Sequence, residues 1–287
     1  METPDYFTRM EAAKRALSGA DKLIIGGGAG LSAAAGLEYG GSRFEKLFAP
    51  WIARYGIGDM YAGGFYPFAT EEERWAYWAH HILANRFDVG PLPLYATLLA
   101  LAGNTDFFVA TTNVESQFEK AGFPADRLFE VQGNYGFIQC AKGCHDGLYP
   151  DEALVRTMDE QARGLRIPSD LVPTCPVCGG PMEVHVRKDA FFVEDAAWRK
   201  ARERYDRFTA SCEGRKTVLL ELGVGFNTPG IIRYPFEIMA RQSPETTTII
   251  RINKYHGAGI RENKGVTIAF DEDMCKALED VREGRRL

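Results

Sequence analysis

A cluster of glycines between a short apolar run and a row of small residues constrains this chain more than any other feature. The segment Leu23–Leu37 reads as a buried strand, a turn containing Gly28 and Gly30, and the beginning of a helix. Glycines let a backbone bend sharply and approach a ligand closely, and a new helix directs free N–H groups at a phosphate. The segment therefore predicts a turn that holds a pyrophosphate, with a purely structural turn as the alternative.

The spacing of these glycines differs from the dinucleotide-binding fingerprint. Gly36 follows Gly30 by six residues, and no acidic residue ends a second strand about 20 residues later. A glycine motif of this kind is therefore no proof of nucleotide binding, and other segments have to decide between the two interpretations.

Composition and charge indicate a globular protein and limit its partners. The 287 residues are 45% hydrophobic and 25% charged, enough for one large domain with an inserted module or for two domains. A net charge of −5 without lysine or arginine runs argues against a nucleic-acid or anionic-membrane partner. Neither a membrane helix of about 18 apolar residues nor a signal-peptide pattern is evident, so we expect a cytoplasmic enzyme.

Short β-branched and aromatic runs alternate with helical stretches, which predicts a parallel sheet covered by helices. The expected strands are Leu23–Ile25, Phe107–Thr111, Leu128–Val131, Val218–Leu222, Thr247–Asn253 and Val266–Phe270. One covering helix is expected directly after Pro91. The others are expected at Leu154–Arg163, Trp198–Phe208 and Met274–Val281.

Two long segments interrupt this alternation and look like insertions. We predict a large domain from residues 1–38, 92–132 and 194–287, a helical, aromatic insertion at 39–91, and a small domain at 133–193. In the first insertion, Trp75 and Trp78 share one helix face. That face either packs in a core or lines a pocket.

The second insertion carries two closely spaced cysteine pairs. Three residues separate Cys140 from Cys144, and two separate Cys175 from Cys178. Two such pairs on tight turns can place four thiolates around one Zn²⁺, as in a zinc ribbon, and four sulfurs leave no position for a catalytic water. We expect a structural zinc site; disulfides are the weaker alternative because cytosolic thiols stay reduced.

Polar side chains follow several of the expected strands. Asn113 and Glu115 follow one strand, Gln132 ends the next, and Asn253 ends a later one. Because the carboxyl ends of parallel strands line a common crevice, these residues are expected to converge with the glycine turn. Amides there suit a hydroxyl-rich ligand such as a dinucleotide, although any single one could be a loop cap.

The order of these motifs resembles the sirtuins, NAD-dependent enzymes with a doubly wound, Rossmann-like parallel sheet and a small zinc-ribbon domain. The resemblance covers nearly the whole chain. The matching pieces are Gly28–Ser32 with Gly36–Leu37, Thr112–Glu115, Gln132–Gly133, the four cysteines, Gly223 and Ile252–Asn253.

The resemblance implies a role for each matching residue. Gly28, Ala29 and Ser32 would bind the NAD phosphates, and Gly223 and Asn253 the adenosine half. Asn113 would face the nicotinamide ribose, and Glu115 the carboxamide pocket.

Three departures from deacylating sirtuins bear on the reaction. Those enzymes carry a histidine where this chain has Gln132 and an aspartate where it has Glu115, and their loop arginine is replaced, in another register, by Arg43. A glutamine cannot accept a proton, so deacylation would lose most of the about 10²–10⁴-fold contribution of a general base. Cleavage of the glycosidic bond needs no such base, which favours ADP-ribosyl transfer with Asn113 and Gln132 as the catalytic pair.

Further motifs resemble one subgroup more closely, the macrodomain-linked class M sirtuins of microbes. They include Gly64–Phe68, Trp75–Trp78, Phe192–Asp195 and Leu220–Pro229. This resemblance implies mono-ADP-ribosylation of a lipoylated carrier similar to the glycine-cleavage H protein, reversed by a macrodomain hydrolase. Glu115 departs even from the aspartate expected in this subgroup, which affects the carboxamide contact and nicotinamide release.

Three other functions stay open at this point. A deacylase would need another base, for which His80, His81, Glu115 and Asp59 are the candidates. A non-catalytic sensor would bind NAD or ADP-ribose without releasing nicotinamide. A hydride-transferring dehydrogenase is the weakest alternative, because no proton-relay histidine is evident. The sequence leaves open whether the 39–91 insertion contacts the acceptor or closes over NAD⁺.

Overall fold

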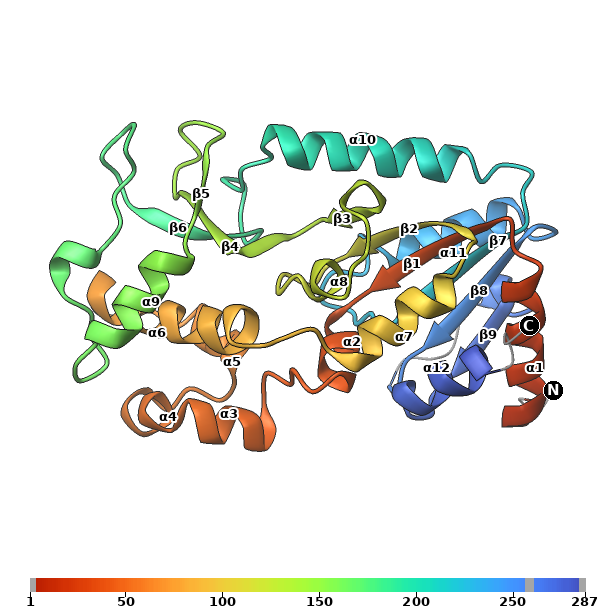
Figure 1. Ribbon diagram of the computed structural model, residues 1–287, viewed down its shortest axis with the longest axis horizontal. Coiled ribbons are helices and arrows are strands. Elements are labelled where there is room, and N and C mark those ends of the chain that lie inside the picture. Colours follow the sequence, from red (N-terminus) through yellow and green to blue (C-terminus); the bar gives the residue numbers. More distant parts are fainter. Residues whose placement is uncertain (1–3, 256–260, 284–287) are drawn as a thin grey trace.

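A six-stranded parallel sheet forms the centre of the computed structural model, which describes residues 4–255 and 261–283 (Figure 1). Its strand order is β3-β2-β1-β7-β8-β9. The strands are β1 (Lys22–Gly27), β2 (Asp106–Thr111), β3 (Leu128–Glu130), β7 (Thr217–Leu222), β8 (Thr247–Ile252) and β9 (Thr267–Phe270). Each predicted strand therefore forms, with bounds that differ from the prediction by two residues at most.

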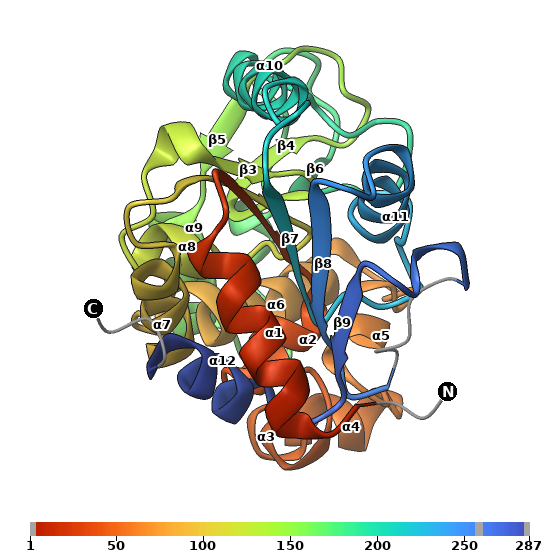
Figure 2. The same cartoon turned by 90° about the vertical axis from the view of Figure 1, so that its right-hand side faces the viewer.

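Helices cover both faces of this sheet (Figure 2). Alternate residues of β1 explain why: Leu23 and Ile25 belong to one buried cluster, and Ile24 belongs to the other. The covering helices are α1 (Tyr6–Ser18), α7 (Pro93–Ala102) and α12 (Met274–Glu283) on one face, and α10 (Ala196–Ala210) and α11 (Arg233–Gln242) on the other. No helix within the described residues is long and apolar enough to cross a membrane.

The strand register brings the loops of the predicted site to one edge of the sheet. Gly27, the last residue of β1, pairs with Thr111 of β2 on one side and with Leu222 of β7 on the other. The chain leaves β1 toward β2 and later returns to β7, so β1 and β7 flank a topological switch point, where α/β sheets bind ligands. The short helices α2 (Ala29–Ala34) and α8 (Gln117–Lys120) follow β1 and β2 at this edge.

Residues 39–91 form a helical layer with an aromatic core. Its elements are α3 (Gly41–Leu47), α4 (Ala49–Tyr55), α5 (Met60–Gly64), α6 (Glu71–Ile82) and the π-helical turn Leu83–Phe87. The Thr70 hydroxyl accepts a hydrogen bond from the Glu73 amide and caps α6. Packing in a core and lining a pocket were the two roles expected for the tryptophans of α6, and each occurs once. Trp75 is fully buried in a core, whereas Trp78 lines a cavity.

A second, antiparallel sheet lies beside this layer, with strand order β5-β4-β6. Its strands are β4 (Gly133–Cys140), β5 (Leu148–Pro150) and β6 (Met182–Val186). The helix α9 (Glu152–Gln161) packs against α6, and both helices share a buried cluster with β4 and β6. The predicted domain boundaries stay predictions; the structure shows one large sheet, one small sheet and one helical layer (Figure 1).

Asp151, at the start of α9, predicts an unusual pH dependence of stability. Its side chain is fully buried, and neither carboxylate oxygen has a hydrogen-bond partner within the described residues. Burial raises the pKa of Asp151 to about 7, although nearby Arg86 opposes the shift. Between about pH 4 and 7 the folded state keeps a proton that the unfolded chain has lost, so the free energy of unfolding falls as the pH rises through this range.

Replacing Asp151 by Asn should remove this dependence. At pH 8 we expect the free energy of unfolding to increase by about 1–3 kcal/mol, and at pH 4 to change little. Urea unfolding of both proteins at each pH measures the effect. Glu160→Gln, at an exposed position of the same helix, is the matched control and should be neutral at both pH values. A destabilised Asp151→Asn protein at pH 8 would contradict the prediction.

Candidate functional site

A cavity of about 610 Å³ lies at the carboxyl edge of the large sheet, where the three parts of the molecule meet. Loops after β1, β2 and β7 form one part of its wall, and α5, α6 and β6 form another. Predicted site residues on this wall are Gly28, Ala29, Ser32, Asn113, Glu115 and Gln132. The parallel sheet therefore brings segments more than 100 residues apart into one site.

The glycine turn packs directly against the loop that follows β7. A Cβ atom on Gly28 would lie 2.7 Å from the carbonyl oxygen of Gly223, and one on Gly223 would lie 2.4 Å from the carbonyl carbon of Gly30. Gly223 also has a positive φ of 61°, which favours glycine. Asn253 donates a hydrogen bond of 2.8 Å to the carbonyl oxygen of Val224 and holds the same loop. Gly223 and Asn253 thus fix the position of the β7 loop, which forms part of the cavity wall.

Asn113, Ser32 and Glu115 belong to one buried hydrogen-bond network. The Ser32 hydroxyl donates to Glu115 Oε1 at 2.5 Å, and the Val114 amide donates to Oε2 at 3.0 Å. The Tyr95 hydroxyl lies 3.2 Å from Glu115 Oε1 and 3.1 Å from the Ser32 hydroxyl. Glu115 is therefore held rigidly by three donors, and Ser32 is turned toward it.

Asn113 is fixed from the glycine turn. Its side-chain amide donates to the carbonyl oxygen of Gly28 at 3.0 Å, and its backbone amide donates to the Thr111 hydroxyl at 3.0 Å. The Asn113 side-chain oxygen is left for other contacts, and the residue lines the cavity. The hydrogen bond from Asn113 to Gly28 therefore joins the loops after β1 and β2 at the residue for which the resemblance implies a ribose contact.

Gln132 lines the cavity opposite these loops, immediately before β4. Its backbone carbonyl accepts a hydrogen bond of 2.9 Å from the Arg187 amide, which ties it to β6. Within the described part of the chain, its side-chain amide has no hydrogen-bond partner and is free to contact a ligand. The structure thus presents a non-titrating side chain at this position.

Like Gly223 and Asn253, the predicted site residue Arg43 is not among the residues that line the cavity. Its guanidinium donates to Asn85 Oδ1 at 2.9 Å and to the carbonyl oxygens of Ala84 and Glu38. Arg43 thus joins α3 to the end of α6, where it positions the helical layer.

A chain of three neutral groups also lines the cavity; the sequence offered His81 as a candidate base, whereas the two tyrosines of this chain were missed. The Tyr135 hydroxyl lies 3.1 Å from His81 Nε2 and 3.0 Å from the Tyr39 hydroxyl. Burial lowers the pKa of His81 to about 3 and raises the pKa of both tyrosines, so all three are uncharged near neutral pH. Neither these residues nor Tyr95 belongs to a local motif, and only the tertiary fold brings them to the site.

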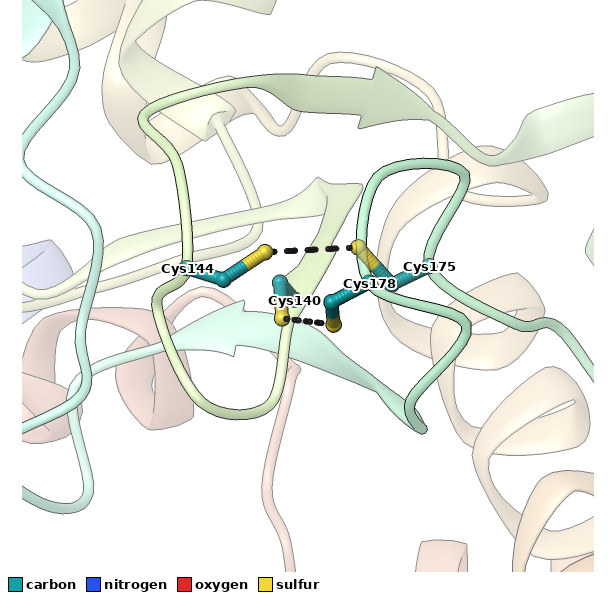
Figure 3. Close-up of side chains that lie close together, drawn as sticks. All are labelled: Cys140, Cys144, Cys175 and Cys178. Atoms are coloured by element: carbon teal, nitrogen blue, oxygen red, sulfur yellow. Dashed lines mark hydrogen bonds between the residues drawn. The ribbon is translucent and has the colours of Figure 1, made fainter.

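The four predicted zinc ligands form a compact cluster at the end of β4 and the turn before β6 (Figure 3). Their sulfur atoms lie within 4.8 Å of one another. The Cys140–Cys178 and Cys144–Cys175 sulfur distances are 3.7 and 3.6 Å. These values match the edge of about 3.8 Å expected for sulfurs around Zn²⁺ and are far longer than a disulfide bond. The residues fit a structural zinc ion, as predicted.

Comparisons with known proteins identify the class. No family model matches the chain. A protein ADP-ribosyltransferase of Staphylococcus aureus (strain Mu50) is 33% identical over 85% of this chain and 78% of its own length. A probable bifunctional ADP-ribose hydrolase/ADP-ribosyltransferase of Fusarium oxysporum f. sp. cubense is 32% identical over 94% of this chain, which spans 47% of that relative. A Sir2 homolog–NAD complex matches 96% of this chain and 94% of its own, with a TM-score of 0.61 at 17% identity.

The fold is therefore that of the sirtuins, with a parallel Rossmann-like sheet and a cysteine-cluster module. Within this fold class, the chain belongs to the sirtuin-type protein ADP-ribosyltransferases, which are enzymes. These findings confirm the fold class, the resemblance and the enzyme class expected from the sequence. They also agree with the predicted NAD co-substrate and structural zinc.

Proposed function

We propose that the protein cleaves the bond between nicotinamide and ribose in NAD⁺ and transfers ADP-ribose to a side chain of a protein acceptor. The observation that carries this proposal is that neither Gln132 nor His81, which both line the cavity, can act as a general base near neutral pH. Gln132 cannot titrate, and the pKa of about 3 leaves His81 too weakly basic to take a proton near pH 7.

The other residues considered as the general base of a deacylase give that function little support. His80 contacts the carbonyl oxygen of Leu47 and Asp159, and it does not line the cavity. The Asp59 carboxylate accepts from the Ala62 amide and caps α5, also away from the cavity wall. Glu115 lies on the wall, but its two carboxylate oxygens already accept hydrogen bonds from Ser32, Tyr95 and Val114 within the protein.

We place NAD⁺ with its pyrophosphate on the turn from Gly28 to Ser32 and its adenosine half toward Gly223 and Asn253. The nicotinamide half then lies toward Asn113, Glu115 and Gln132. Asn113 would bind the ribose next to the bond that breaks, and Gln132 would orient a ribose hydroxyl without accepting its proton. Arg43 keeps only an indirect role here, because it is bound within the helical layer.

The proposed reaction needs electrostatic stabilisation more than proton transfer. Nicotinamide leaves with the electron pair of its bond to C1′ and becomes neutral, while positive charge develops on the ribose. The acceptor nucleophile then forms a bond to C1′, and any proton it carries goes to solvent. The buried Glu115 carboxylate and the amide oxygens of Asn113 and Gln132 are suited to stabilise the developing positive charge.

We further propose a lipoylated carrier, similar to the glycine-cleavage H protein, as the acceptor. The apolar part of the cavity lining supports a long apolar arm there, because Tyr61, Phe65, Trp78, Val184 and Val186 all belong to it. In this proposal the 39–91 insertion contacts the acceptor. The hydrolase named in the fungal relative supports a functional link to a macrodomain enzyme that removes the modification. A cytoplasmic location, where the cysteines stay reduced, completes the proposal.

The direct test incubates the protein with NAD⁺ and a lipoylated carrier and follows both products by mass spectrometry. We expect one ADP-ribose on the carrier and an equal amount of free nicotinamide, and Asn113→Ala should lower both by at least tenfold. Ligand binding without nicotinamide release over hours would instead identify a sensor. Removal of acyl groups from acyl-lysine peptides would identify a deacylase, and Gln132→His tests whether a restored base makes that reaction appear.

A further inference from the structure

Phe226 is an aromatic side chain on the cavity wall that the proposed function leaves without a role. It lies in the loop after β7, between Val224 and Thr228, and all of this loop lines the cavity. The side chain is 55% exposed, which is unusual for a phenylalanine. An aromatic ring held at a cavity wall with much of its surface accessible is suited to contact a flat ligand group.

A fully buried network of charges lies below this loop. Glu221, the residue before the end of β7, is 0% exposed and accepts hydrogen bonds from Arg233 and Arg251 at 2.8–3.0 Å. Arg251, its register partner on β8, also pairs with Glu237 of α11 at 2.7 Å. Among the described residues, this network holds two arginines and two glutamates. Because buried charges are costly to desolvate, we expect this network to have a specific role.

Arg233 connects the network to Phe226. It is the first residue of α11 and is 4% exposed, and its Nε and Nη2 atoms both donate to Glu221 Oε1. Its guanidinium carbon lies 4.8 Å from the centroid of the Phe226 ring. A guanidinium at this distance attracts the face of an aromatic ring. Glu221 therefore fixes Arg233, and Arg233 fixes the ring.

The sheet order indicates which half of a dinucleotide would meet this ring. β1 lies between β2 and β7, so the loop carrying Asn113 and Glu115 and the loop carrying Phe226 lie on opposite sides of the glycine turn. A dinucleotide whose pyrophosphate sits on that turn extends one half over each loop. Since the proposed function puts the nicotinamide half at Asn113 and Glu115, the half over the β7 loop is the adenosine half.

We propose that Phe226 is a stacking platform for the purine ring of the dinucleotide and that Arg233 is the positioning residue that holds it; this rests on the proposed NAD⁺ site. Every base presents a flat π-face, so stacking on Phe226 binds the ring without reading its hydrogen-bonding edge. The buried charge network then increases the affinity for the nucleotide, because it fixes the conformation of the β7 loop before the ligand binds.

Calorimetric binding of two probes, ADP-ribose and nicotinamide mononucleotide, tests the platform. Phe226→Leu should weaken ADP-ribose binding about tenfold and leave nicotinamide mononucleotide binding unchanged, and Phe226→Trp should keep the affinity for both. Tyr234→Leu is the matched control, because this 49% exposed aromatic adjoins Arg233 outside the cavity wall. Unchanged ADP-ribose binding by Phe226→Leu, or a loss confined to the mononucleotide, would overturn the assignment.

A double-mutant cycle tests the role of Arg233. Arg233→Lys keeps the charge but loses the paired hydrogen bonds, and we expect it to weaken ADP-ribose binding in the parent and to add little in the Phe226→Leu background. Additive losses would mean that Arg233 acts on the fold alone and would refute the positioning role. If Arg233→Lys does not fold, the Phe226 variants still decide the main proposal. Failure of ADP-ribosyl transfer by the unchanged protein would refute the proposed function without affecting either binding comparison.

Discussion

Removing zinc from the four-cysteine site is expected to unfold the small sheet and abolish ADP-ribosyl transfer. Cys140 and Cys175 are buried in the same cluster as Ile138, Met182 and Val184, so the metal site forms part of that core. Structural zinc contributes an apparent about 10–16 kcal/mol to the folding of zinc-finger peptides. Without the ion, no bond would hold together the four cysteine sulfurs, which lie within 4.8 Å of one another.

Hydrogen exchange before and after treatment with a strong chelator measures this effect. Protection should be lost in β4 and β6 and kept in β1 and β7, and transfer should stop because β6 forms part of the cavity wall. Cys178→Ser should reproduce the loss. Cys275→Ser, a cysteine outside the cluster, is the control and should retain zinc and activity. Full protection of β6 in zinc-free protein would show that the module folds without metal.

Replacing Gly30 by Ala is expected to disrupt the nucleotide site with the next largest effect. The added Cβ would lie 2.7 Å from the Gly223 Cα and 2.9 Å from its carbonyl oxygen. Both atoms are backbone, so the loops after β1 and β7 have to move apart. We expect a loss of about 1–3 kcal/mol in unfolding free energy and at least tenfold weaker ADP-ribose binding.

Thermal unfolding and calorimetry on the same samples separate these two effects. Gly230→Ala is the matched control, since a Cβ there would meet nothing within 4 Å and the residue lies in the same β7–α11 connection. It should leave both stability and binding near the parent values. Equal ADP-ribose affinity in the Gly30→Ala protein would mean that the contact between the two loops does not shape the site.

The strands and the metal cluster were predictable because their signals are local. Leu23–Ile25 is an apolar run beside glycines, and two cysteines two or three residues apart already define half of a zinc site. Asn113 and Gln132 line one cavity, as expected for residues that follow parallel strands ending at one edge, and their roles stay predictions.

The remaining features depend on distant pairing. Glu221 looks like a polar strand end in the sequence, and only the β7–β8 register shows that it faces Arg251 inside the protein. The contacts of Arg43 depend on distant pairing too, because its guanidinium binds Asn85 and Ala84, 42 and 41 residues further along the chain. Tyr95 lies on a helix with no motif, yet its hydroxyl joins Ser32 to Glu115.

The cavity wall is divided between the large sheet and the rest of the molecule. Gly28, Asn113 and Phe226 lie in loops of the large sheet, whereas Tyr61 and Phe65 lie in the 39–91 segment and Val184 lies on β6. On the proposed function, we therefore expect substitutions at Tyr61, Phe65 or Val184 to change the choice of acceptor while nucleotide binding is kept.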